Sequence, residues 1–146
     1  MGVFSKSCEY AMRAVFYIAR STHEGRKVGI KEIAENIKSP EPFLAKILQK
    51  LSKEGIVFSI KGPNGGFYLT EENLQRPIAD IVISMDGQEI LTGCALGLDY
   101  CSENNPCPLH NEFKSIRNNL NKMLINTTIG QFNEELIKGD LRLFKE

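Results

Sequence analysis

The sequence predicts a mainly α-helical fold that carries one small β-hairpin. Two observations lead to this prediction: apolar residues recur at helical spacing in several separate segments, and a Gly/Pro/Asn turn divides two β-rich runs. The chain has 146 residues, of which 42% are hydrophobic and 25% charged, as in an ordinary soluble globular protein. A chain of this length can bury a hydrophobic core without the support of disulfides.

Three helices are predicted first. The first, over about 7–21, carries one apolar stripe, and the second, over 30–37, repeats apolar residues at i, i+3, i+4 and i+7. A third helix is expected over 41–54, because Pro42 can occupy its first turn without losing a needed N–H. We expect this helix to bury Leu44, Ile47, Leu48 and Leu51.

A β-hairpin follows the third helix. Two β-rich runs, 56–61 and 67–70, flank the turn Gly62-Pro63-Asn64-Gly65-Gly66, which gives the hairpin a basic and glycine-rich tip. Three short helices followed by a hairpin is the order of a winged helix-turn-helix, in which the third helix enters the DNA major groove and the wing touches the flanking backbone. We therefore assign residues 1–76 to a winged helix-turn-helix DNA-binding domain.

Residues 77–146 are predicted to hold a cysteine-containing sensor loop and dimerisation helices. A helix near 77–85 precedes a loop over 86–108, a long helix from Leu109 and a short helix over 129–138. The long helix carries a heptad-like apolar seam, and such a seam needs a partner helix. We expect a homodimer with an interface that contains Leu109, Phe113, Ile116, Leu120, Met123 and Leu124.

Charge is divided unevenly along the chain, although the formal net charge is zero. Residues 1–70 contain eleven Lys and Arg against six Asp and Glu, whereas 71–146 contain seven against twelve. This division is typical of a protein with one end facing phosphates. The expected DNA contacts are Phe43, Ala45, Lys46, Gln49, Lys50 and Lys53 on the third helix and Lys61, Gly62, Asn64 and Gly65 on the wing.

Two alternatives to double-stranded DNA binding stay open. Lysines on one amphipathic helix are often only its solvated face, and winged helices also serve as protein-interaction modules. The DNA interpretation depends on the coincidence of the three-helix order, the proline break, the glycine-rich hairpin and the local positive charge.

Three of the four cysteines cluster in the predicted loop. Cys94, Cys101 and Cys107 are separated by six and five residues, and His110 follows three positions after Cys107. Thiolates with an imidazole suit iron in clusters or zinc, and a loop rich in Gly, Asn and Pro can bring spaced ligands together. Spacing alone leaves iron-sulfur, structural zinc, a thiol redox switch and buried structural cysteines as alternatives.

Several function classes are not expected. No convergent set of acid and base residues indicates an enzyme. No segment approaches the roughly 20 apolar residues of a membrane-spanning helix, and no secretion signal is recognisable near the N-terminus. We expect a cytoplasmic protein without a membrane partner.

The motifs together resemble a known family over nearly the whole chain. They are SCEYAMR at 7–13, FLAKILQKL at 43–51 and the wing sequence KGPNGGF at 61–67. In these the chain is similar to the bacterial winged-helix repressors (Rrf-two type) that include IscR, NsrR and CymR. The resemblance implies a two-fold dimer held by the long helix and a palindromic operator. The chain differs at Ala45 from the iron-sulfur cluster regulator of the family, which reads bases there with a glutamate. The operator preference of that regulator therefore cannot be transferred to this chain.

The resemblance also implies a cofactor. In the iron-sulfur cluster regulator, three cysteines and a histidine at this offset bind a 2Fe-2S cluster, and Cys94, Cys101, Cys107 and His110 match them, with a first gap one residue longer. Nitric-oxide-sensing relatives use an acidic residue from the first helix of the other subunit, where Glu9 stands here. We expect His110 as the fourth ligand, with Glu9 as the alternative, and a DNA-binding repressor controlled by this cluster.

Overall fold

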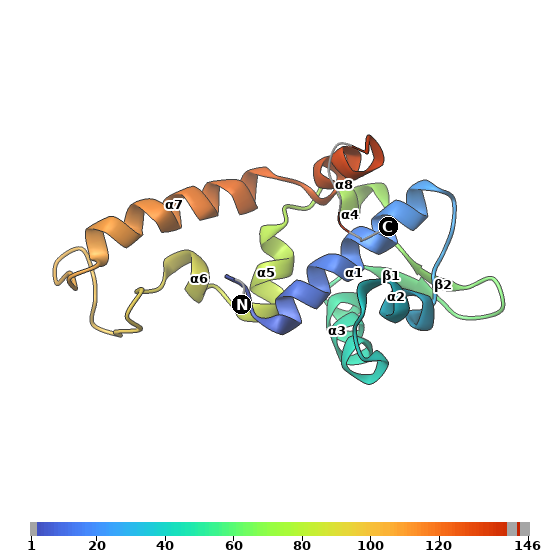
Figure 1. Cartoon of the computed structure of the whole chain (residues 1–146), viewed down its shortest axis with the longest axis horizontal. Helices are drawn as coiled ribbons and strands as arrows, with labels where there is room; N and C mark the ends of the chain where they lie inside the picture. Colours follow the sequence, from blue (N-terminus) through green and yellow to red (C-terminus); the bar gives the residue numbers. More distant parts are fainter. Residues whose placement is uncertain (1–2, 140–142, 144–146) are drawn as a thin grey trace.

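A computed structural model describes residues 3–139 and 143, so the last residues of the predicted 77–146 unit lie partly outside the described part of the chain. The mainly helical fold with one antiparallel hairpin is confirmed (Figure 1). The elements are, in order, α1 (Lys6–His23), α2 (Ile30–Ile37), α3 (Glu41–Lys53), β1 (Phe58–Ile60), β2 (Gly66–Tyr68), α4 (Glu71–Leu74), α5 (Ala79–Asp86), α6 (Glu89–Thr92), α7 (His110–Asn126) and α8 (Ile129–Ile137).

The first three helices surround one core. The helix α1 begins where the Ser5 side chain accepts a hydrogen bond from the Cys8 N–H, and Pro42 lies in the first turn of α3. The predicted inner face of α3 is buried as expected, with Leu44 and Leu51 fully covered. This burial fixes which face of α3 remains outside, and that face holds the predicted DNA contacts.

The wing is a short hairpin joined to the body by a third segment. Phe58 pairs with Tyr68 and Ile60 with Gly66, and Val28 exchanges two backbone hydrogen bonds with Phe67, 3.1 and 2.7 Å long. The loop before α2 therefore anchors the base of the wing to the helices.

The chain then returns to α1 through α5 and α8. Both helices pack against α1, and Ile81 and Ile129 are buried in the same hydrophobic core as α2 and α3. The boundary predicted at residues 76 and 77 stays a prediction, but packing between elements crosses it. Thr70 and Thr128 start α4 and α8 with reciprocal capping hydrogen bonds.

The helix α7 extends away from this body, with the cysteine loop at its far end (Figure 1). Within the chain α7 packs mainly against the short helix α6 and the end of α5. The sequence did not predict α4 and α6, because four residues are too few for helical periodicity to show. No helix within the described residues combines the length and apolarity that crossing a membrane requires.

Candidate metal centre and nucleic-acid interface

The three predicted cysteine ligands converge in the loop between α6 and α7. One ligand atom from each of Cys94, Cys101 and Cys107 lies within 4.8 Å of the others, and the Sγ atoms of Cys94 and Cys107 are 3.6 Å apart. Gly97, at φ +70°, turns the chain between the first two cysteines. All three thiols are partly exposed and free of disulfides. Three thiols this close to one another could hold a soft or borderline metal.

The surroundings in the loop shift the pKa values of Cys94 and Cys101 in opposite directions. The backbone N–H groups of Leu98 and Leu96, with the neighbouring thiols, lower the pKa of Cys94 to about 7 against partial desolvation. The backbone N–H of Cys107 lowers the pKa of Cys101, but desolvation and the adjacent thiols outweigh it and raise that pKa above its ordinary value. Metals bind the thiolate form of cysteine, and the lowered pKa of Cys94 favours that form.

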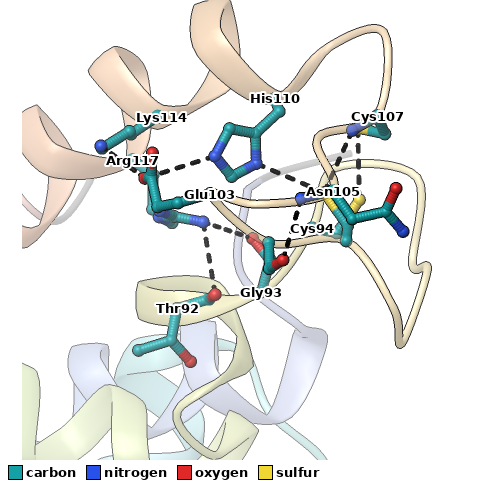
Figure 2. A network of polar contacts seen from close by, with 11 residues as sticks. Thr92, Gly93, Cys94, Glu103, Asn105, Cys107, His110, Lys114 and Arg117 are labelled. Atoms are coloured by element: carbon teal, nitrogen blue, oxygen red, sulfur yellow. Dashed lines mark hydrogen bonds and ion pairs between the residues drawn. The ribbon is translucent and has the colours of Figure 1, made fainter.

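His110 stands beside the thiols at the first residue of α7. Its Nδ1 lies 3.3 Å from the Sγ of Cys101, and its Nε2 lies 3.3 Å from Oε1 of Glu103 (Figure 2). Glu103 also meets the Lys114 ammonium at 2.5 Å, and Lys114 and His110 hold the pKa of this carboxyl below its usual range. The predicted fourth ligand thus lies next to Cys101, while the group of mutually close ligand atoms found within the described residues contains only the three cysteines.

Two side chains of α7 fasten the start of the loop. Arg117 donates from Nη1 to the carbonyl oxygens of Thr92 and Gly93, at 3.3 and 2.9 Å (Figure 2). Asn121 donates to the carbonyl of Leu91 at 2.8 Å. These carbonyls end α6, where backbone acceptors lack partners within the helix. Cys94 follows directly, so α7 holds both ends of the cysteine loop.

Glu9 and Cys8 lie elsewhere, on α1. Glu9 sits in the first turn of that helix, 3.6 Å from the Lys6 ammonium, and does not join the metal-ligand group found within the described residues. Its role as an alternative ligand would need a second subunit and stays a prediction. Cys8 is fully buried, and burial, with Asp86 and Glu9, raises its pKa to about 12. Cys8 is therefore a core residue.

The predicted DNA-contacting residues of α3 and the wing are almost all exposed to solvent. On α3 these are Phe43, Ala45, Lys46, Gln49, Lys50 and Lys53, and at the wing Lys61, Gly62 and Asn64 are exposed while Gly65 is half-buried. A shallow depression between α3 and the wing is lined by Ala45, Gln49, Ser52 and Ser59, among others. Among the described residues, no carboxylate lies within 4.0 Å of the ammonium groups of Lys46, Lys50, Lys53 and Lys61. Their charges are available to phosphates.

The wing glycines are required by close backbone contacts. A Cβ at Gly65 would lie 2.0 Å from the Ile60 carbonyl oxygen, and one at Gly66, at φ +137°, would lie 2.8 Å from the Val28 backbone. Only glycine fits both positions. The GG pair of the wing motif therefore shapes the tip and joins it to Val28.

The predicted dimer residues of α7 are mostly uncovered. Ile116 is 63% exposed, and Leu109 and Met123 are also exposed, whereas Phe113 and Leu120 are partly covered. Leu124 is 1% exposed and packs in the core of its own chain, so it contributes no free surface. The seam thus leaves an apolar strip along α7.

Sequence reasoning did not identify Glu103, Lys114, Arg117 and Asn121. Their contacts join residues up to 30 positions apart and depend on how the loop folds back on α7. A weak signal existed in the helical spacing of Lys114, Arg117 and Asn121, which places them on adjacent turns of α7.

Comparison with known proteins identifies the fold and the family. The family model Rrf2, described as an iron-dependent transcriptional regulator, matches residues 4–135. A protein of Aquifex aeolicus described as an HTH-type transcriptional regulator is 37% identical over 87% of this chain and 88% of its own length. The transcriptional regulator IscR of Cronobacter sakazakii is 26% identical over 88% of this chain and 79% of its own length.

Solved structures share the same fold. CymR (YrzC), the global cysteine regulator of B. subtilis, superposes with a TM-score of 0.72 at 21% identity, covering 92% of this chain and 98% of that one. IscR of T. potens gives 0.73 at 22% identity, covering 98% and 93%. Family and relatives are transcriptional regulators, not enzymes. The chain, with its winged-helix fold, therefore belongs to the Rrf2 family of DNA-binding transcriptional regulators.

Proposed function

We propose that this regulator is a homodimer that binds a palindromic operator under the control of an iron-sulfur cluster, of the 2Fe-2S type, held by Cys94, Cys101, Cys107 and His110. The observation that carries the proposal is the convergence of three thiols within 4.8 Å of one another beside the His110 ring. The family description, which names iron, supports the same cofactor.

The two shortest donor contacts, within a set of three mutually close thiols, are compatible with two ligands on each iron of a two-iron centre. Cys94 and Cys107 are 3.6 Å apart at sulfur, and Cys101 lies 3.3 Å from Nδ1 of His110. A 2Fe-2S cluster takes two protein ligands on each iron, and histidine can replace cysteine there. When bound, the cluster supplies a redox-active group that oxidants and nitric oxide can modify. A structural zinc bound by all four donors is the second candidate, because three cysteines and one histidine also form a closed tetrahedral set.

Control of DNA binding would pass through α7. Its first residue is the ligand His110, Arg117 holds the start of the loop, and the exposed strip along α7 would pair with a second copy. A change in the loop therefore alters the base of the dimer helix and with it the spacing of two α3 helices. Those helices would lie in successive major grooves about one helical turn apart.

The test begins with anaerobic reconstitution with iron and sulfide. We expect about two irons and two sulfides per chain and absorption between 300 and 600 nm. Cys107→Ser should lose this spectrum, whereas the matched variant Cys8→Ala, altered at a buried cysteine outside the group of three, should retain it. A colourless wild-type protein without iron would overturn the cluster, and one tightly bound zinc per chain in its place would favour the second candidate.

The DNA part is tested separately with a fragment selected from random-sequence DNA by the protein itself. Lys61→Ala should weaken binding to all sequences and flatten the salt dependence by about 0.9 unit of slope, because one phosphate contact is lost. Gln49→Ala should instead change the sequence preference. Full affinity after joint removal of Lys50, Lys53 and Lys61 would contradict docking through α3 and the wing.

A further inference from the structure

We propose that Glu103 is a positioning residue that holds His110 with Nδ1 toward the thiols, and that Lys114 holds Glu103 in place. This inference rests on the proposed metal site and adds to it two residues that neither the motifs nor the family match assign. It also specifies which ring nitrogen of His110 binds the metal.

The orientation of the His110 ring is the first observation. Nδ1 points to Cys101 Sγ at 3.3 Å, while Nε2 is buried and makes no hydrogen bond to any described residue. Glu103 Oε1 lies 3.3 Å from Nε2, within ion-pair distance. A buried N–H without a partner is costly, so a small rotation that closes this contact is favoured.

The second observation is how Glu103 reaches the ring. Residues Ser102 and Asn105 exchange two backbone hydrogen bonds, 3.2 and 3.1 Å long, and so close a tight turn that contains Glu103. From this turn the carboxylate reaches Lys114 at 2.5 Å, one turn of helix beyond His110 (Figure 2). Glu103 is 63% exposed, so without the ammonium of Lys114 its side chain would have many other conformations.

Together these contacts assign the tautomer of the imidazole. A proton on Nε2 faces the carboxylate of Glu103, which leaves the lone pair of Nδ1 directed at the thiols. A histidine that binds a metal commonly donates its other N–H to a carboxylate, which fixes the ring and makes the ligand more basic. Glu103 has the place and chemistry for this role.

The experiment compares reconstituted wild type with Glu103→Ala, Glu103→Gln and Lys114→Met. The matched control is Glu112→Gln, at an exposed position of α7, the helix that also carries Lys114. Loss of the cluster to a chelator should be about 10 to 100 times faster in Glu103→Ala. Glu103→Gln should recover most of the retention, because its amide oxygen still accepts from Nε2–H. Lys114→Met should fall between wild type and Glu103→Ala, and Glu112→Gln should match wild type.

The reduction potential separates positioning from mere folding. It should rise in both Glu103 variants, because each removes a negative charge beside the cluster, although only Gln preserves retention. Equal retention and equal potential in wild type and Glu103→Ala would overturn the inference while the proposed cluster stands. Should wild type take up no iron, the same series is loaded with Co²⁺ as a zinc substitute and its thiolate absorption followed. Binding of neither metal overturns both the proposed function and this inference.

Discussion

The two ends of the molecule are built differently. The helices α1–α3 bury their apolar faces within the chain, whereas α7 leaves much of its apolar surface exposed and the cysteine loop is held by polar contacts at its ends. The DNA-reading end is therefore stable by its own packing. We propose that a second chain and a metal complete the other end, in which case its order depends on what binds it.

The largest effect that tests this contrast is a cavity in the core. Leu48, on α3, is 1% exposed, and Leu48→Ala should lower the free energy of unfolding by about 2–5 kcal/mol. Ile125, on α7, is 55% exposed, and Ile125→Ala should change it by less than about 0.5 kcal/mol. Urea denaturation followed by circular dichroism measures both. Equal losses would remove the contrast.

The next effect concerns the exposed strip of α7. Ile116→Glu puts a charge into the proposed dimer seam and should raise the dimer dissociation constant about 100-fold, or about 3 kcal/mol. Asn118→Glu adds the same charge on another face of the helix and should leave the dimer intact. Sedimentation over a range of concentrations measures both variants. An unchanged Ile116→Glu dimer would place the interface elsewhere.

A smaller effect is expected where α7 holds the loop. Arg117→Gln removes the charged donor to Thr92 and Gly93, which should speed amide hydrogen exchange in residues 89–96 about five- to tenfold. Amides of α1–α3 should not change, and Lys122→Gln, at an exposed position of α7, serves as the control. Acceleration throughout the molecule would mean that the two ends unfold as one unit.

The smallest effect is a pH dependence within the reading end. The Tyr17 hydroxyl donates to Glu32 at 2.6 Å and Arg26 lies 3.2 Å away, and both lower the pKa of Glu32. A lowered folded-state pKa stabilises the protein above the unfolded value of about 4.3, and this contribution is lost as pH falls through the folded value. Glu32→Gln should reduce acid sensitivity below about pH 4 by roughly 0.5 kcal/mol, a small effect because the pair is exposed. Thermal unfolding at pH 3–7 measures it, and an unchanged pH profile would contradict it.

The sequence predicted most of the regular elements and the residues that we propose as metal ligands. Helices such as α3 were predictable because burial imposes a period on residues such as Leu44 and Leu51. The family pattern placed His110 with the cysteines, and the structure sets them side by side. Both signals are local in sequence or carried by distinctive residue types.

The remainder depended on packing between distant segments. Leu124 fits the apolar pattern of the seam equally well, but α7 meets the body of its own chain at that end, which buries it. Glu103, Lys114 and Arg117 are common surface residues whose roles appear only when the loop has folded. Periodicity contains no information about such contacts.

The straight run of α7 from His110 to Thr127 has a mechanical consequence. Its 17 residues form a rod of about 25 Å, fixed at its far end by Leu124 in the core and by the Thr127 carbonyl, which accepts from Ile78 at 2.9 Å. If the helix turns by about 5° about that fixed end, its other end, at His110, moves by about 2 Å. In the proposed mechanism α7 is a lever arm, and its stiffness sets how much of a local change at the thiols reaches the winged helix.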